Sequence, residues 1–319
     1  MDELHFPWPL LIFEALDSRR EMSSDELERY RRLEKGFFGE KMLLDQLNSI
    51  DRSKVLPLFD FLFEIENQEV QIDCLLLTSE TVFLLEVKNY SGDYYFKNNK
   101  IYHLNTNREI YNPITQLERT EFLFKKLLQE MRIKFPVRSY VIFVNPKFFL
   151  YQSPIQSRFI HYGQIDRFLS KATHHEGRLT SRVVKLKEEL SKRKKDRSKY
   201  EVLPEYKLED LRRGLFCKKC QSGLVRKGQL FLYCNRCKCK FHLYDMLLYS
   251  IAQFHLLFPE KKITTKQITD WCGNLFSRVF VSRFLKRHLR MKPNGSQTYY
   301  TFETEEEPIK LLMKKYNQN

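Results

Sequence analysis

Hydrophobic positions in the first 173 residues follow a helical period in some stretches and a strand period in others. Residues 24–48 place apolar side chains at helical spacing. Residues 70–78 and 81–89 are apolar, rich in branched side chains and of strand length. The elements predicted after them are a hairpin about Asn98-Asn99, a helix at 114–131 and a buried strand at 140–144. The order of helix, β-meander, helix and strand predicts an α/β sandwich.

The pattern changes in the C-terminal part of the chain. Residues 178–199 begin with helical spacing and end in the basic run SKRKKDRSK, which predicts a helical linker. Five cysteines follow, and then three short helices and a hairpin are predicted. The predicted organisation is an N-terminal domain with a helical extension at 1–175, a linker at 176–205, a cysteine-containing module at 206–243 and a helical module with a hairpin at 244–319.

Composition narrows the class of protein. The chain has 319 residues, 42% of them hydrophobic, which suffices for two or three packed domains. No run of eighteen apolar residues exists, and the N-terminus lacks a basic segment followed by an apolar one. Membrane-spanning and secreted proteins are therefore excluded, and a cytoplasmic location is expected.

Charge is unevenly distributed along the chain. Residues 1–180 sum to −2, whereas residues 181–319 carry 31 Lys plus Arg against 14 Asp plus Glu, a net +17. An excess of this size predicts a polyanionic partner for the C-terminal part.

Two CxxC pairs predict a metal site. Thirteen residues separate the pair Cys217 and Cys220 from the pair Cys234 and Cys237, a spacing typical of two turns that hold one structural Zn²⁺. Cys239 or His242 could replace a cysteine of the second pair. A redox CxxC is disfavoured because such motifs are single. A hairpin turning at Lys227-Gly228 between the pairs is similar to a zinc ribbon.

The two apolar runs also carry a pair of carboxylates. If Ser79-Glu80 is a two-residue turn, counting outward places Asp73 opposite Glu86, and Lys88 shares the face of Glu86. Opposed like charges between apolar strands need a compensating cation. A divalent metal with a lysine beside it suits phosphodiester hydrolysis. The alternative is an ion-pair ladder of Glu86 and Lys88 at a sheet edge, with Asp73 unrelated, although the apolar flanks disfavour an edge.

Four motifs in order carry a family resemblance. The segments Gly36-Phe-Phe-Gly-Glu40, Gln71-Ile-Asp73, Glu86-Val-Lys-Asn-Tyr-Ser-Gly92 and Asn112-Pro-Ile-Thr-Gln116 resemble the nuclease-related domain (NERD) family. That family is itself similar to the PD-(D/E)xK restriction-endonuclease-like superfamily. The resemblance covers about residues 30–170.

The resemblance implies a restriction-endonuclease-like αβββαβ core and Mg²⁺-dependent (or Mn²⁺-dependent) nuclease chemistry. Asp73, Glu86 and Lys88 match the D…ExK positions, Glu40 the helical glutamate, and Gln116 a polar residue that lines the cleft in some members. The alternatives for the last two are a surface acid and a helix-face amide. Fold similarity alone does not establish activity.

The last module is similar to a winged helix-turn-helix in its order of elements and its charge. Its third helix would enter a DNA groove. The alternative is a helical protein-interaction domain with a solvated basic face. The predicted nucleic-acid contacts are Lys218 and Lys219, then Arg283, Lys286, Arg287 and Arg290, with the basic linker residues Lys192 to Lys195 ranked below them.

The sequence therefore predicts a metal-dependent nuclease or DNA-processing protein whose C-terminal zinc-ribbon and winged-helix modules deliver it to nucleic acid, with DNA favoured. The competing hypothesis is a non-catalytic nucleic-acid-binding or regulatory protein that uses the nuclease-like domain as a scaffold.

Overall fold

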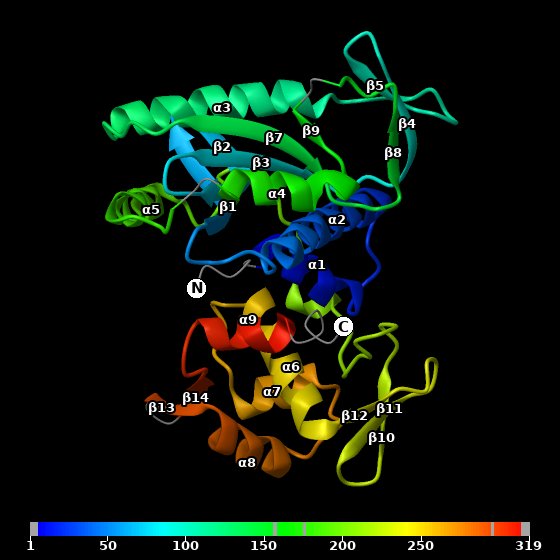
Figure 1. The fold of residues 1–319 in the computed structure, drawn as a ribbon. Coiled ribbons are helices and arrows are strands. Elements are labelled where there is room, and N and C mark those ends of the chain that lie inside the picture. The colour runs from blue at the N-terminus through cyan, green and yellow to red at the C-terminus, as the bar shows by residue number, and fades with distance from the viewer. Residues whose placement is uncertain (1–5, 156–157, 175–176, 295–296, 314–319) are drawn as a thin grey trace. The chain divides into compact units, whose positions relative to one another are not determined.

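The computed structural model describes residues 6–155, 158–174, 177–294 and 297–313. The chain forms two compact units (Figure 1). Unit 1 contains Arg32–Glu201, and unit 2 contains Phe6–Arg31 together with Val202–Asn319. The first unit is built on a mixed sheet with helices and the second on short helices with two small sheets, so the predicted α/β class is confirmed.

The main sheet of unit 1 has the strand order β1-β2-β3-β7-β9. Its first three strands are antiparallel, and β3, β7 and β9 run parallel. The chain order α2, β1, β2, β3, α3, β7 is the predicted helix, meander, helix, strand order, with β1 as a strand that the sequence pattern did not reveal. The bounds are α2 Ser24–Leu47, β1 Leu56–Ile65, β2 Gln68–Leu77, β3 Val82–Lys88, α3 Pro113–Glu130, β7 Val137–Phe143 and β9 Phe159–Ile160.

A second sheet, of order β6-β5-β4-β8, is inserted between β3 and α3 and after β7. The predicted hairpin forms part of it: Asn98 and Asn99 both have positive φ, as a two-residue type I′ turn requires. The remaining elements of unit 1 are β4 Gly92–Lys97, β5 Lys100–His103, β6 Glu109–Ile110, β8 Phe148–Tyr151, the 3-10 turn η1 Tyr162–Gln164, α4 Ile165–His174 and α5 Ser181–Arg193.

Helix α5 lies in the segment that was predicted to be a linker. Val183, Leu186 and Leu190 are buried in one core with side chains of β1, β2 and α3. Beyond the helix, the backbone N–H of Lys195 donates to the carbonyl of Leu62, and its ammonium contacts Glu64 and Glu69 at 2.6 and 2.7 Å. Residues 181–201 therefore belong to unit 1, which differs from the prediction because the apolar stripe of α5 has a sheet to pack against.

We expect Leu186→Ala to destabilise unit 1 by about 2–5 kcal/mol, because it removes a buried side chain from a packed core. Val184→Ala is the matched control, since Val184 lies on the same helix but is 49% exposed. Chemical denaturation of the two variants measures the difference. Equal stability of the two variants would show that the packing of α5 does not stabilise unit 1, as is expected of a tether.

Unit 2 contains the predicted C-terminal elements in the predicted order. Strands β10–β12 form one three-stranded sheet, and β13 and β14 form a hairpin whose tip, at residues 295–296, lies outside the described residues. The elements are α1 Trp8–Asp17, the 3-10 turn η2 Leu208–Asp210, β10 Leu224–Lys227, β11 Phe231–Cys234, β12 Lys240–His242, α6 Leu243–Leu257, α7 Thr265–Trp271, α8 Arg278–His288, β13 Arg290–Asn294, β14 Gln297–Thr301 and α9 Glu306–Met313.

The N-terminal helix α1 belongs to unit 2, although the sequence placed it with the N-terminal domain. Arg19, which follows α1, is fully buried. Its guanidinium donates to the carbonyl of Arg212 at 3.0 Å and to Ser250 Oγ at 3.1 Å, and it lies 3.5 Å from the ring centroid of Trp271. Burial lowers the pKa of Arg19 to about 9. This residue fixes the N-terminal segment to α6 and α7, a contact that local sequence patterns do not predict.

No helix among the described residues is both long enough and apolar enough to cross a membrane.

Candidate active site and cysteine cluster

The turn between β2 and β3 sets the register of the candidate active site. Cys74 pairs with Leu85 and Leu77 with Val82, which is the register counted from a two-residue turn. One step further, the Asp73 carboxylate accepts a hydrogen bond from the Val87 backbone N–H at 2.7 Å. Because β2 and β3 are interior strands of the main sheet, Glu86 and Lys88 do not form a ladder at a sheet edge.

Lys88 connects β3 to helix α3. Its ammonium donates to Glu86 Oε1 at 2.6 Å and to Gln116 Oε1 at 3.3 Å. Gln116 lies in the first turn of α3, which Asn112 caps by accepting from the backbone N–H of Ile114 and which Pro113 begins. The Asn-Pro-Ile-Thr-Gln motif therefore sets the start of the helix that brings Gln116 to Lys88.

Helix α2 packs closely against the end of β3. A Cβ atom at Gly39 would lie 3.0 Å from Asn89 Cβ and 3.4 Å from Val87 Cγ1, so glycine permits this approach. Asn89 Nδ2 donates to the backbone carbonyl of Lys35 and fixes the helix there. The next residue, Glu40, lies near enough to Asp73 and Glu86 for their charges to raise its pKa.

The pKa values of the clustered side chains are shifted by burial and by their neighbours' charges. Burial, followed by repulsion from Glu86, raises the pKa of Asp73 to about 7. Burial and the charge of Asp73 hold the pKa of Glu40 well above its usual value. Burial disfavours the Lys88 ammonium, but attraction to Glu86 outweighs it and raises the pKa of Lys88. Negative charge therefore exceeds the positive charge that this site supplies.

Two further charged residues border this cluster and were missed in the sequence. Asp60 lies in β1 with φ of 51°, between the two residues that pair with the neighbours of Asp73 on β2, and its charge raises the pKa of both Asp73 and Glu40. The sequence could have indicated this residue, because an aspartate stands out within the apolar run LPLFDFLFEI. Lys194, from the segment predicted as a linker, donates to the carbonyl of Phe59 and favours ionisation of Glu40.

The donors of this cluster suit a hard divalent cation. Carboxylate oxygens are the ligands that Mg²⁺ prefers, and a cation would relieve the repulsion that raises the pKa of Asp73. Among the described residues, the cysteines discussed below form the one group of three or more possible ligands whose atoms lie within 4.8 Å of one another. The acidic cluster supplies carboxylates but does not form such a group.

The comparison with known families concerns the segment that holds the acidic cluster. Residues 35–144 match the family model of the nuclease-related domain. The predicted resemblance is confirmed for this stretch, which includes Glu40, Asp73, Glu86, Lys88 and Gln116. A nuclease-related domain implies a nucleic-acid substrate and a divalent metal. No curated protein and no solved structure matches the chain.

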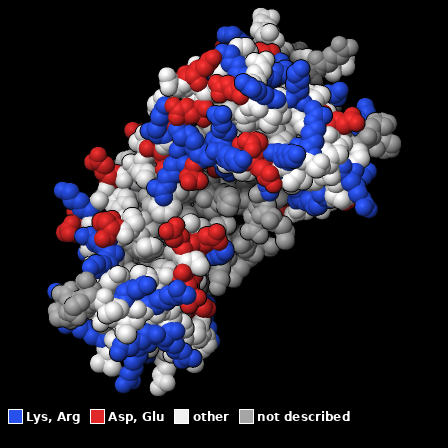
Figure 2. Space-filling model, turned by 90° about the vertical axis from the view of Figure 1, so that its left-hand side faces the viewer, with Lys and Arg blue, Asp and Glu red and all other residues white. Residues whose placement is uncertain are grey.

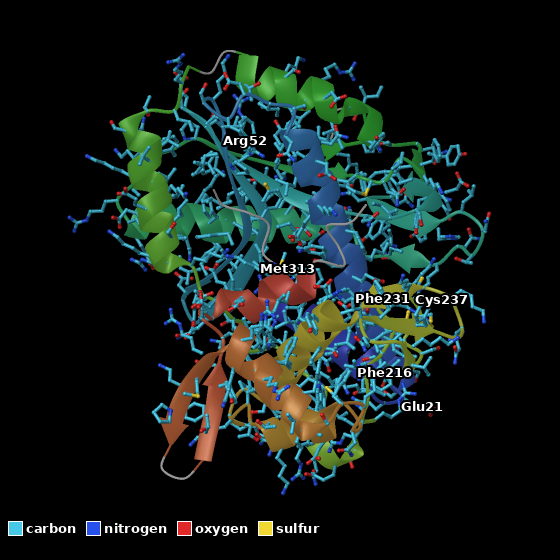
Figure 3. All side chains as sticks on the ribbon, turned by 90° about the horizontal axis from the view of Figure 1, so that it is seen from below. Glu21, Arg52, Phe216, Phe231, Cys237 and Met313 are labelled. Carbon is cyan, nitrogen blue, oxygen red and sulfur yellow. The ribbon has the colours of Figure 1, made fainter. Side chains whose placement is uncertain are left out.

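The thiols of Cys217, Cys220, Cys234 and Cys237 lie within 4.8 Å of one another, in unit 2. The Sγ atoms of Cys217 and Cys237 are 3.5 Å apart, and those of Cys220 and Cys234 are 3.4 Å apart. Tetrahedral Zn²⁺ with Zn–S bonds of about 2.3 Å separates its sulfurs by a similar distance. Figure 3 labels Cys237 and, on the adjoining β11, Phe231. This group could hold a metal ion.

The turns around these thiols have the geometry of metal-binding knuckles. The backbone N–H of Lys219 points at Cys217 Sγ, and that of Cys237 at Cys234 Sγ. Cys239 and His242, the predicted substitutes, lie outside the group. Cys239 accepts through its backbone carbonyl from the N–H of Cys234, and the His242 ring packs on Phe231 and Tyr244.

The predicted nucleic-acid contacts differ in accessibility. On α8, Phe284 is buried, whereas Arg283, Lys286, Arg287 and the following Arg290 are exposed. Lys and Arg side chains gather on the face of unit 2 visible in Figure 2. Lys219 is exposed, but the Lys218 ammonium lies 4.0 Å from the ring centroid of the buried Tyr249. Lys192 and Lys195 form ion pairs within unit 1.

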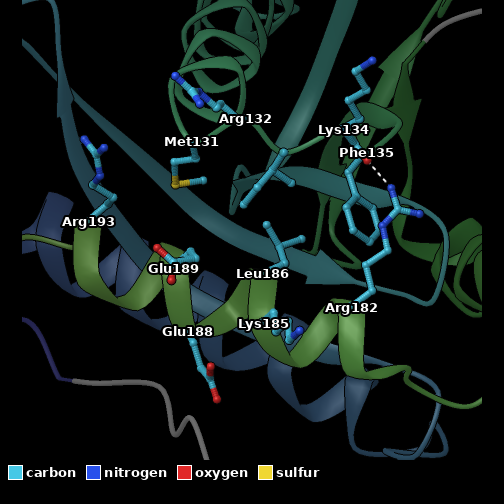
Figure 4. Close-up of a pocket in the computed structure, with 11 residues that line it drawn as sticks. Met131, Arg132, Lys134, Phe135, Arg182, Lys185, Leu186, Glu188, Glu189 and Arg193 are labelled. Atoms are coloured by element: carbon cyan, nitrogen blue, oxygen red, sulfur yellow. Dashed lines mark hydrogen bonds between the residues drawn. The ribbon is translucent and has the colours of Figure 1, made fainter.

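A cavity of about 600 Å³ lies between the C-terminal end of α3 and α5 (Figure 4). Arg182 donates to the carbonyl of Lys134 and stacks on Phe135 at its wall. Its lining contains none of the acidic cluster, because Gln116 lies at the other end of α3. The cavity is therefore separate from the candidate active site.

Proposed function

We propose that the protein is a metal-dependent nuclease that hydrolyses phosphodiester bonds at the cluster of Asp73, Glu86 and Lys88. The observation that carries this proposal is the pairing of Lys88 with Glu86 beside a carboxylate whose pKa is raised to about 7, within a nuclease-related domain. An ion-pair network without function would not require the buried Glu86 and the half-buried Asp73 to lie where their charges repel, at a cost in stability.

The residues have separate roles in this proposal. Asp73 and Glu86 hold Mg²⁺ or Mn²⁺, which when bound polarises the phosphate and lowers the pKa of a water molecule. Lys88 places positive charge where the phosphate gains negative charge, and Gln116 fixes the ammonium of Lys88. Glu40, whose pKa burial and the charge of Asp73 hold well above its usual value, exchanges a proton or completes the cation's ligands.

The first test is cleavage by the unaltered full chain. Duplex DNA, single-stranded DNA and RNA are incubated with Mg²⁺, with Mn²⁺ and without an added divalent cation. Chelators are avoided because they would also remove a metal from the cysteine cluster. Cleavage that requires the divalent cation supports the proposal, whereas intact substrates under every condition favour a scaffold role for the domain.

We further propose that the four cysteines hold one structural Zn²⁺ in a zinc ribbon and that residues 244–319 form a winged-helix-like module for DNA. Two observations support the module. Ile263, between α6 and α7, forms an isolated antiparallel β-bridge with Tyr300 of β14 and so ties this segment to the hairpin. Ser277 caps α8 and starts the basic helix directly after the turn from α7. Residues 202–319 carry 22 Lys plus Arg against 10 Asp plus Glu.

Replacing Arg283, Lys286 and Arg287 together with Ala should weaken nucleic-acid binding and flatten its salt dependence. Each phosphate contact on duplex DNA contributes about 0.9 to the slope of log affinity against log salt, so losing three contacts lowers the slope by up to about 3. Cleavage at saturating nucleic acid should be unchanged. Titration of the full chain at several salt concentrations measures the slope.

The control variant for this test removes the same charge from unit 1, through the exposed Arg132, Arg138 and Lys171. An equal loss of slope in both variants would show that net charge, and not α8, determines affinity. The delivery proposal would then be wrong.

A further inference from the structure

Aromatic side chains lie side by side on the second sheet of unit 1, apart from the acidic cluster. Tyr102 of β5 pairs with Tyr95 of β4, which pairs with Tyr151 of β8. Phe149 lies two residues before Tyr151 on the same strand. We call Tyr95, Tyr102, Phe149 and Tyr151 the aromatic face. It spans three neighbouring strands, β5, β4 and β8 (Figure 1).

Strand alternation directs the aromatic face outward. The neighbouring residues Tyr94, Phe96 and Phe148 pack with Ile101 and Leu150 against the core under this sheet. The side chains between them in sequence therefore point to the other side. Phe149 is 57% exposed and Tyr151 is 52% exposed. Tyr95 and Tyr102 are half-buried beside them. A contiguous group of rings that solvent reaches indicates an interaction surface.

The rings are held in an ordered arrangement. Those of Tyr95 and Tyr102 stack, with centroids 5.2 Å apart and an interplanar angle of 19°. Tyr95 Oη donates to Asn107 Oδ1, and Tyr151 Oη donates to Asp93 Oδ1, both at 3.3 Å. These hydrogen bonds at the ring edges fix the rings of Tyr95 and Tyr151.

Cations border the aromatic face. Lys97 and Lys100, paired across the hairpin, share its side of the sheet, and Lys147 is exposed just before β8. The acids on this side are engaged: Glu109 forms an ion pair with Lys100 at 2.8 Å, and Asp93 accepts from Tyr151. Aromatic planes edged by lysines suit a flat, uncharged group that is linked to phosphates.

The aromatic face is continuous with the candidate active site through the backbone. Strand β4 begins at Gly92, shortly after Lys88 at the end of β3. The backbone carbonyl of Lys88 accepts from the N–H of Val144, and the Gly92 N–H donates to the carbonyl of Lys147. A short segment of chain therefore joins Lys88 to the strand that carries Tyr95.

We propose that the aromatic face binds the unpaired bases of single-stranded nucleic acid. This inference rests on the proposed nuclease function, because it assigns the substrate class of the same domain. Base stacking on aromatic rings is tolerant of sequence, and a duplex buries the base planes within its own stack. The aromatic face should therefore distinguish single strands and frayed ends from intact duplex.

Binding of the full chain to a fluorescent oligothymidine and to a duplex of equal length tests the proposal, without divalent cation so that no cleavage occurs. The variants are Phe149→Ala and Tyr151→Ala, and the control is Phe122→Ala, an exposed phenylalanine of α3 outside the aromatic face. Each variant of the aromatic face should weaken single-strand binding about ten-fold at every salt concentration, with an unchanged salt slope. Duplex binding should not change.

Phe149→Trp provides a gain of signal. The two tryptophans of the unaltered chain, Trp8 and Trp271, lie in unit 2. Quenching of the additional tryptophan fluorescence by the oligonucleotide would therefore report stacking at position 149. This variant should retain single-strand binding.

The outcomes separate this inference from the nuclease proposal. Unchanged single-strand affinity in both alanine variants, or equal losses for single strand and duplex, would overturn base stacking even if the protein cleaves DNA in Mg²⁺. Loss of single-strand affinity alone would support it even if no cleavage occurs, and the nuclease proposal would then fail separately.

Discussion

Asp73→Asn is expected to reduce Mg²⁺-dependent cleavage by about a thousand-fold or more while the protein remains folded. The substitution removes one of two carboxylates that face each other across β2 and β3, and with it a charged ligand for the cation, worth several kcal/mol in the transition state. The amide oxygen of Asn can still accept the hydrogen bond from the Val87 N–H, so the local structure should persist. Single-turnover cleavage measures the loss.

The same variant should be more stable than the unaltered protein at neutral pH without divalent cation. The folded protein raises the pKa of Asp73 from 3.8 to about 7, so it retains a proton that the unfolded chain releases near pH 4. Stability linked to this group is complete below about pH 4 and is lost as pH rises towards 7. The gain in melting temperature on Asp73→Asn should therefore be larger at pH 8 than at pH 5.

Added Mg²⁺ gives a readout that does not depend on activity. It should raise the melting temperature of the unaltered protein at pH 8 more than that of Asp73→Asn. Asp45→Asn, an exposed aspartate on the helix that carries Glu40, serves as the control and should change neither stability nor cleavage. Full cleavage by Asp73→Asn would remove this residue from the active site.

The centre of the candidate site could be predicted because it depends on local rules. A two-residue turn fixes the register of a hairpin, and side chains alternate along strands, so Asp73, Glu86 and Lys88 follow from counting. The position of Gln116 could also be predicted, because it lies in the first turn of a helix whose capped start is visible in the sequence. Asp60 could not be placed in this way, because its position depends on pairing between β1 and β2 and on a left-handed backbone conformation within the strand.

The domain boundaries depended on long-range packing and were predicted less well. The basic run after α5 has the composition of a tether, yet Lys195 and Lys199 contact Glu64, and Glu69 accepts from Lys195 and Ser198. Likewise, α1 belongs to unit 2 because Arg19 finds its hydrogen-bond acceptors there. A fragment that starts at residue 202 would lack α1 and leave the pocket of Arg19 empty, so binding tests require the full chain.

Cys220→Ser is expected to abolish binding of one equivalent of Zn²⁺ and to unfold the sheet β10–β12. The buried apolar side chains of this sheet are few among the described residues: Leu224 and Leu232, beside the thiols of Cys217 and Cys234. A segment with so small a core depends on its metal, whose binding contributes on the order of 10 kcal/mol in comparable modules. Metal analysis gives the stoichiometry, and hydrogen exchange over residues 224–242 reports the folding of the sheet.

The chain supplies a matched control for this prediction in Cys239. It lies two residues beyond Cys237, but its thiol is outside the group of four, so Cys239→Ser should keep the zinc and the protection of the sheet. Loss of zinc in Cys239→Ser with retention in Cys220→Ser would show that the ligands are misassigned. If the unaltered protein and both variants all contain almost no zinc, the four thiols hold no metal. The two knuckles are then stabilised by the hydrogen bonds from the Lys219 and Cys237 backbone N–H groups to sulfur. Because α6 follows β12 directly, unfolding of the sheet should also weaken nucleic-acid binding through α8, which the salt titration of the same variant measures.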